Sequence, residues 1–273
     1  TSDIVLSDYK TIVPNWYSEK GSEFSKSLEE LLNDCLSSDL SKHMILTAPG
    51  GVGKSALLAF LHDELVRNKK EFELVEGVTK KDVMEQHLRA LFHKQSNRSS
   101  SLISILAIDE ALGGGFQEVT QARIWLEEAK KHSVRLLLVD ANFIAEAQDS
   151  NYSDQVIARC HRHVLMTPDQ HPRDIPYIIA GIIDRYAPEH ITAVDIQGDF
   201  LLAFVDAMLE EPRIREWEEE IKQAVEQVFE GTPPGQPAKL TSANLSRRVK
   251  RYLDSYAAPI AAESWYKLNL AHN

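Results

Sequence analysis

The sequence has few cysteines, no surplus of basic residues and no long apolar run. Cys35 and Cys160 are the only cysteines among 273 residues, which is too few for a disulfide framework, and they do not have the spacing of a zinc site. A reducing, cytoplasmic location fits this composition best. The chain has 30 Lys and Arg residues against 41 Asp and Glu, and this net charge of -11 argues against a protein that coats nucleic acid. A small local basic patch is still compatible with it.

Apolar stretches long enough for a membrane are also missing. The longest apolar runs contain about eight residues, whereas a membrane-spanning helix needs roughly twenty. No basic segment followed by an apolar stretch stands at the N-terminus, so we expect neither export nor membrane insertion. The first residue is Thr1 and not Met, which suggests a piece of a longer protein or a processed chain.

The chain from Met44 to Thr167 alternates short apolar runs with amphipathic stretches, which is typical of a parallel sheet with crossover helices. The strands that we expect are at residues 44–47, 72–76, 103–108, 134–139 and 163–166. The helices that we expect between them are at residues 54–67, 81–93, 117–131 and 152–160. The run LISILAI is apolar on both alternations, as in a central strand that helices cover on both faces.

After Thr167 the strand pattern nearly disappears and helical periodicity takes over. The helices that we expect here are at residues 173–186, 198–209, 212–229 and 242–256. In the third, apolar residues recur at spacings of three and four, namely Ile214, Trp217, Ile221, Val225 and Val228. We interpret this face as packed against its neighbours, with a partner-binding helix as the alternative.

These patterns predict a P-loop type α/β fold with a parallel five-stranded sheet between helices, followed by a smaller all-helical lid domain. We expect the nucleotide-binding domain over residues 1–168, with residues 1–40 as a lead-in. The lid domain is expected over residues 169–273.

The segment MILTAPGGVGKSALLAFL has the order strand, glycine-rich loop and helix, and it matches G-x-x-x-x-G-K-[ST] except that Ala48 stands at the first glycine. Such a loop points backbone N–H groups at phosphate oxygens, and the following helix directs its positive end to the same place. Lys54 is expected to reach the β and γ phosphates of ATP, and Ser55 to bind Mg²⁺. The predicted nucleotide-binding residues are Pro49, Gly50, Gly51, Val52, Gly53, Lys54, Ser55 and Ala56. Alanine at position 48 is compatible with the turn if its φ is negative.

Acidic residues follow the most apolar expected strand. Asp109 ends the run ILAID and is expected to hold the metal through the water molecules bound to it. The alternative is that Asp109 and Glu110 are ordinary solvated residues at a strand end. Glu110 would orient and polarise the water that attacks the γ phosphate. The next expected strand is followed by Asp140 and Asn142, and we favour Asn142 as a contact of the γ phosphate or the water, because an amide both donates and accepts. A plain Asp-Ala-Asn turn is the alternative.

Together these segments resemble the AAA+ ATPases, over roughly residues 20 to 256. The stretches IDEALGGGFQEVTQARIWLEEAKKHSVRLLLVDAN and HPRDIPYIIAGIIDRY look like the sigma-54 activators within that superfamily. The resemblance implies a homo-oligomeric ring, a hexamer or heptamer. It also implies an arginine that reaches a neighbouring subunit's nucleotide, for which Arg159 fits best and Arg162 is second. Arg247 is our choice for an arginine in the lid, with Arg248 as the alternative, on a helix that Ser242 can cap. Any of these arginines could instead be an ordinary surface residue.

The chain departs from the sigma-54 activators in one respect. Their Gly-Ala-Phe-Thr-Gly-Ala loop has no counterpart between Glu76 and Ser101, so we expect a different client. The leading hypothesis is an ATPase that couples ATP binding and hydrolysis to oligomerisation and remodelling or switching of an unidentified protein partner. The alternatives are a STAND-like nucleotide-dependent signalling switch and a nucleic-acid-linked motor or loader, the latter not favoured by the acidic balance.

Overall fold

The computed structural model describes residues 2–5, 23–75, 80–96, 104–146, 148–165, 167–170, 172, 175–255 and 265–269. Its contacts divide the chain into two compact units. One consists of residues 21–50 and 57–165, and we call it the α/β unit. The other contains residues 51–56 and the described residues at the two ends of the chain, and we call it the C-terminal unit. No helix within these described ranges is long and apolar enough to cross a membrane.

The α/β unit is built on a parallel five-stranded sheet in the order β3-β4-β5-β2-β6. The strands are β2 (His43–Thr47), β3 (Glu71–Val75), β4 (Ser104–Asp109), β5 (Val134–Asp140) and β6 (Cys160–Val164). The helices are α1 (Glu23–Leu36), α2 (Lys54–Arg67), α3 (Lys81–Ser96), α4 (Val119–Lys131), α5 (Phe143–Glu146) and α6 (Ser150–Gln155). The predicted five-stranded parallel sheet between helices is therefore confirmed.

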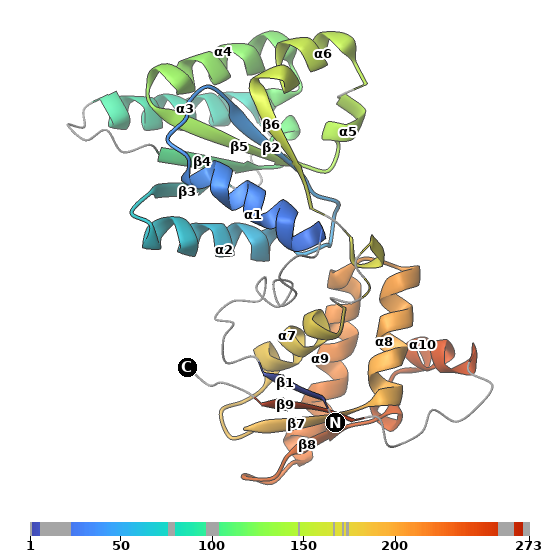
Figure 1. The fold of residues 1–273 in the computed structure, drawn as a ribbon. Helices are drawn as coiled ribbons and strands as arrows, with labels where there is room; N and C mark the ends of the chain where they lie inside the picture. The colour runs from blue at the N-terminus through green and yellow to red at the C-terminus, as the bar shows by residue number, and fades with distance from the viewer. Residues whose placement is uncertain are drawn as a thin grey trace. The chain divides into compact units, whose positions relative to one another are not determined.

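Helices cover both faces of this sheet (Figure 1). On one face, Ile45, Leu106 and Leu138 belong to the same buried cluster as Met84 of α3 and Trp125 of α4. On the other face lie α1 and α2 (Figure 1). Every residue of β2 and β5 is buried, because both are inner strands with helices above and below.

The last strand and the helix before it differ from the prediction. The expected helix at 152–160 is the short α6 followed by a 3₁₀ turn, Ile157–Arg159, and the strand begins at Cys160, earlier than the expected 163. His161 and His163 interrupt the apolar pattern of this strand. Their ring nitrogens Nδ1 and Nε2 each lie 2.8 Å from Asp34 Oδ2 of α1, so the two histidines face a carboxylate and not an apolar layer.

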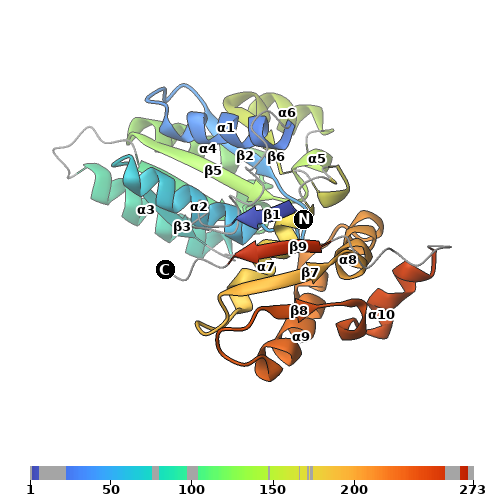
Figure 2. The same ribbon diagram turned by 60° about the horizontal axis from the view of Figure 1, so that its bottom comes forward.

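The C-terminal unit combines helices with a second sheet, so the prediction of an all-helical lid was wrong. The sheet has the order β1-β9-β7-β8, and Figure 2 shows these four strands side by side. The strands are β1 (Ser2–Val5), β7 (Ala193–Gln197), β8 (Ala238–Leu240) and β9 (Trp265–Asn269). The strands have three to five residues each, and β1 pairs with β9 from the far end of the chain, a pairing that no local pattern shows.

Three long helices carry the rest of this unit, α7 (Ile175–Tyr186), α8 (Gly198–Glu210) and α9 (Ile214–Gly231). The apolar face predicted for α9 is confirmed as a packing face. Its residues Ile214, Trp217, Ile221 and Val225 are buried, and Val228 is half-buried. The expected helix at 242–256 is broken into a 3₁₀ turn (Ser242–Asn244), α10 (Arg247–Lys250) and a second 3₁₀ turn (Arg251–Ser255).

The helix expected at 242–256 is interrupted because two successive N-terminal caps occur within it. Thr241 and Asn244 form a reciprocal capping box that closes the first turn, and the Ser246 side chain then accepts a hydrogen bond from the Val249 N–H at 3.3 Å. The residue that caps the arginine-bearing helix is therefore Ser246 and not Ser242.

His43, at the start of β2, gives the α/β unit a specific pH dependence. Its Nδ1 accepts from the Leu136 N–H at 3.1 Å, so the neutral ring carries its proton on Nε2, which donates to the Leu126 carbonyl at 2.8 Å. Burial lowers the pKa of His43 from 6.5 to about 4. The unfolded chain therefore takes up a proton at a higher pH than the folded chain does, and stability is lost as the pH falls from 6.5 towards 4.

We predict that His43→Gln, which keeps a neutral donor for the Leu126 carbonyl, removes this part of the pH dependence. The wild type should lose up to about 3 kcal/mol more than the variant across that range. Urea unfolding of both proteins at pH 7, 5.5 and 4.5 measures the difference. Parallel pH profiles would show that His43 does not titrate between the two states.

Candidate functional site

The carboxyl ends of three parallel strands meet at one edge of the five-stranded sheet. β5 lies between β2 and β4, with Thr47 opposite Asp140 and Asp109 opposite Val139. The ends of β2, β4 and β5 therefore differ by no more than one residue in register. In open α/β sheets this edge is where ligands bind.

The predicted phosphate loop connects β2 to α2 and begins at this edge. Gly51 and Gly53 have φ values of 79° and 94°, which L side chains rarely adopt, so the path of the loop requires glycine at both positions. Ala48 is buried and is not among the residues with positive φ, as its place in the motif requires. A Cβ atom at Gly50 would meet nothing within 4 Å, so there is open space beside the loop at that point.

The loop ends where α2 begins, at Lys54. A helix of 14 residues that starts directly after a glycine loop offers unpaired N–H groups and a positive dipole end to an anion. Val52 is buried, whereas Pro49 and Lys54 are half-buried. Ser55 and Ala56 are in the first turn of α2, and their side chains lie outside the described part of the structure. The backbone thus fits phosphate, and the Ser55 hydroxyl stays a predicted metal ligand.

Asp109 is the last residue of β4, and the backbone turns sharply after it. The Asp109 Oδ1 atom accepts a hydrogen bond of 2.9 Å from the Glu110 N–H. Glu110 has a φ of 57°, in the left-handed region that non-glycine residues seldom occupy, and its side chain is exposed. Such strain costs about 1–3 kcal/mol and is found preferentially at active sites and ligand clamps. Glu110, the strained residue, is also the residue that the sequence predicts to be catalytic.

Asp140 ties two of the strand ends together, a role that the sequence reasoning missed. Its buried carboxylate accepts hydrogen bonds from the N–H groups of Leu112 and Asn142, at 3.2 and 2.9 Å, and its carbonyl accepts from the Ala48 N–H at 3.3 Å. The segments that follow β4 and β2 are thus both fixed to the end of β5. The sequence does contain a signal for this role, namely an acidic residue at the end of a wholly apolar-flanked, buried strand.

Asn142 lies just beyond Asp140 and is exposed. Its carbonyl accepts from the N–H groups of Ala145 and Glu146 at the start of α5, at 2.9 and 3.2 Å. The side-chain amide makes no polar contact with another described residue. The backbone of Asn142 therefore forms a turn, as in the alternative interpretation of the Asp-Ala-Asn segment. Its side chain is available for a ligand.

The arginines predicted near β6 differ in their surroundings. Arg159 Nε lies 3.1 Å from Glu127 Oε1, and its Nη1 donates to the carbonyls of Gln155 and Asp154 at 2.5 and 3.4 Å. The guanidinium group thus caps the end of α6 within the same chain. Arg162 is exposed and makes no polar contact with another residue in the described ranges.

A magnesium ion would have to use a small set of protein ligands here. Among the described residues, no group of three or more His, Cys, Asp or Glu side chains could hold a metal ion. Mg²⁺ in phosphate-binding sites typically takes one or two carboxylates and completes its shell with phosphate and water oxygens. The single carboxylate of Asp109 at the strand end fits that donor set.

Comparison with solved structures identifies the fold. The chain matches NtrX from Brucella abortus in complex with ATP with a TM-score of 0.57, over 90% of this chain and 57% of that one, at 15% identity. The fold is that of the AAA+ proteins. Aeropyrum pernix Orc1 in complex with DNA matches with a TM-score of 0.57, over 89% of this chain and 68% of that one, at 11% identity. Saccharomyces cerevisiae Hsp104 in complex with casein matches with a TM-score of 0.56, over 90% and 45% of the two chains, at 14% identity.

The predicted resemblance to AAA+ proteins, including a sigma-54 activator, is therefore confirmed for the fold. The chain spans little more than half the length of NtrX. No protein-family model matches the sequence, and no curated protein matches it.

The strain at Glu110 leads to a prediction about stability. We expect Glu110→Gly to raise the free energy of unfolding by about 1 kcal/mol, because glycine adopts a positive φ without a Cβ clash. Ser133→Gly is the matched control, since Ser133 has the same φ of 57° between α4 and β5, away from the carboxyl ends of the strands. Chemical denaturation measures both variants. A loss of stability in Glu110→Gly alone would mean that the Glu110 side chain stabilises the fold.

Proposed function

We propose that this chain binds ATP with Mg²⁺ and hydrolyses it, and that it does so in a homo-oligomer that remodels or switches a protein partner. The observation that carries the proposal is the meeting of three strand ends, one leading into the glycine loop and one ending in Asp109 and strained Glu110. The shared fold with NtrX, whose structures contain ATP or ADP, supports a nucleotide as the ligand. The acidic net charge favours a protein client over nucleic acid.

In the proposed site, different residues bind the phosphates, hold the metal ion and activate the attacking water. The N–H groups of residues 50–55 bind the phosphates, and Lys54 neutralises charge on the β and γ groups. Asp109 and Ser55 would hold Mg²⁺, which supplies further positive charge when bound. Glu110 orients the attacking water and accepts its proton, while Asn142 contacts the γ phosphate.

Two arginines complete the proposed site from outside this edge. For the arginine that reaches a neighbouring subunit, the contacts favour Arg162 over Arg159, because the Arg159 guanidinium already bonds to Glu127 and two carbonyls. For the lid, they favour Arg247, which is exposed and makes no polar contact with a described residue. A subunit that lacks the neighbour's arginine lacks one of the charges that stabilise the transition state, so hydrolysis should require assembly.

Single substitutions separate binding from hydrolysis. We predict that Lys54→Ala abolishes ATP binding, whereas Glu110→Gln binds ATP as the wild type does and hydrolyses it at least ~100-fold more slowly. Calorimetric titration with ATP and a phosphate-release assay on the same preparations measure the two effects. Tight ATP binding by Lys54→Ala would contradict the assignment of the site.

Mixing two inactive variants tests the shared site. Lys54→Ala subunits lack nucleotide but keep Arg162, and Arg162→Ala subunits bind ATP but lack the arginine. We predict that each is inactive alone and that the mixture recovers part of the ATPase rate, since arginines of this kind contribute on the order of 1,000-fold or more. Arg159→Ala is the matched variant and should lose much less activity. If the mixture stays inactive and Arg159→Ala is the dead variant, the trans assignment to Arg162 is incorrect.

A further inference from the structure

The first turn of α9 takes its cap from the glycine loop. The N-cap residue of α9 is Arg213, whose side chain makes no capping hydrogen bond. The first N–H groups of a helix have no acceptor inside the helix, and Ser, Thr, Asp or Asn at the N-cap ordinarily supplies one. Here the Gly51 carbonyl accepts a hydrogen bond from the Arg215 N–H at 3.1 Å. The loop backbone thus satisfies a donor that the sequence before α9 leaves open.

The same two segments are also in van der Waals contact. A Cβ atom added at Gly51 would lie 3.6 Å from the Cβ of Arg213 and 3.8 Å from the Cβ of Arg215. Both arginine side chains are exposed, so the atoms close to the loop belong to the backbone and its first side-chain carbons. Residues 51–56 and α9 are parts of the same compact unit.

The hydrogen bond to Gly51 sets the orientation of one peptide group in the loop. Glycine adopts both signs of φ readily, so the peptide groups beside it turn easily unless something holds them. The peptide bond between Gly51 and Val52 is trans, and its carbonyl and N–H therefore lie on opposite sides of one planar group. Because the Arg215 N–H holds the carbonyl on one side, the Val52 N–H is directed to the other.

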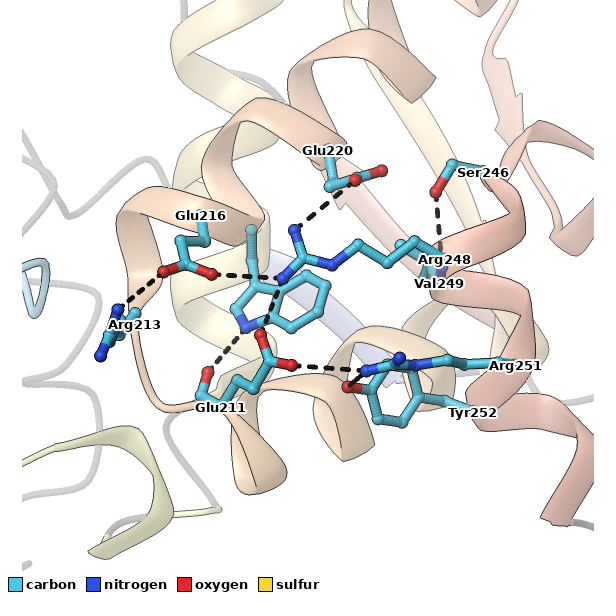
Figure 3. Close-up of polar contacts among 10 residues, drawn as sticks. Glu211, Arg213, Glu216, Glu220, Ser246, Arg248, Val249, Arg251 and Tyr252 are labelled. Atoms are coloured by element: carbon cyan, nitrogen blue, oxygen red, sulfur yellow. Dashed lines mark hydrogen bonds and ion pairs between the residues drawn. The ribbon is translucent and has the colours of Figure 1, made fainter.

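The donor on α9 is itself held in place by contacts that do not involve the loop. Figure 3 shows Glu211 and Glu216, which lie on either side of Arg215 in the sequence, bound to the same Arg248 Nη2 through their Oε2 atoms, at 2.7 and 3.2 Å. The buried Trp217 donates its Nε1–H to the Glu211 carbonyl at 2.7 Å. These bonds close the turn before α9 on its first residues, so the Arg215 N–H is a fixed donor.

We propose that Arg215 is a positioning residue that acts through its backbone N–H, holding the Gly51 carbonyl so that the Val52 N–H is preset to bind a phosphate oxygen. This inference rests on the proposed function, because it takes the glycine loop as the phosphate site. A donor that is already oriented binds more tightly than one that must first be turned, since less freedom is lost on binding. The Arg215 side chain takes no part, because it is exposed and makes no polar contact with a described residue.

Removal of a single N–H group tests the proposal. Arg215→Pro removes the donor within the first turn of the helix, where proline is tolerated, whereas Arg215→Ala keeps the N–H and removes the side chain. We expect Arg215→Pro to raise the Kd for ATP at least about tenfold, the effect of one lost hydrogen bond to a charged group. Arg215→Ala should change the Kd by less than about threefold. Calorimetric titration measures each Kd.

Thr120→Pro is the matched control for the proline itself. Thr120 is the second residue of α4, as Arg215 is of α9, and within the described residues its N–H has no backbone acceptor. It should leave the Kd for ATP unchanged. If Arg215→Pro binds ATP as the wild type does, or if Arg215→Ala binds it as weakly as Arg215→Pro, the inference is overturned. Should Arg215→Pro fail to fold, replacing the Arg215 amide by an ester removes the same N–H, and the same increase in Kd is expected.

Titration with inorganic triphosphate separates this inference from the proposed function, because triphosphate needs the loop but no contact with base or ribose. A chain that binds triphosphate and not ATP contradicts the proposed function, while at least about tenfold weaker triphosphate binding by Arg215→Pro supports the inference. A chain that binds neither ligand contradicts both.

Hydrogen exchange without any ligand gives a second reading. The Arg215 amide should exchange at least about tenfold more slowly than the amide of Ile214, whose N–H has no backbone acceptor in the described part of the chain. Equal exchange of the two amides would mean that the bond to Gly51 does not hold the loop, and the inference would be overturned.

Discussion

Parallel pairing of β4, β5 and β2 brings three strand ends to one edge of the sheet, and the candidate site depends on this register. A slip of one residue would turn the buried strands over and separate Asp109 from the loop after Thr47. Asp140 secures the arrangement, since its carboxylate and carbonyl bind N–H groups from the segments that follow β4 and β2. A buried carboxylate whose two oxygens each accept a backbone N–H is well suited to hold this edge of the sheet.

Three residues at or just beyond the carboxyl ends of these strands have backbone conformations that L residues seldom adopt. Gly51, Gly53 and Glu110 all have positive φ, and Glu110 is the one of the three with a side chain. The sheet and its helices supply the burial that keeps such residues in place. Among the arginines proposed for the site, the structure separates those with polar contacts in their own unit from those that are exposed. Arg159 and Arg248 make several polar contacts within their own units, whereas Arg162 and Arg247 are exposed.

The sequence predicts the α/β unit well because each of its elements carries its own signal. The helix predicted at 54–67 has those bounds in the structure. The wholly buried strands β2 and β5 contain the apolar runs at residues 44–46 and 136–139. Prediction failed where the signal is shared between distant segments. β6 contains histidines that face Asp34 from α1, and β1 pairs with β9 from the opposite end of the chain. Nothing local in the sequence shows which of two adjacent arginines finds carboxylate partners on another helix.

The central claim is that a magnesium nucleotide is held between the loop after β2 and the carboxylate at the end of β4. A crystal structure of the chain with Mg²⁺ and a non-hydrolysable ATP analogue tests it most directly. We predict that the β and γ phosphate oxygens accept hydrogen bonds from the N–H groups of residues 50–55, with the metal coordinated on the side of Asp109, directly or through water. An analogue bound elsewhere, or a loop that stays empty at saturating analogue, would contradict the account.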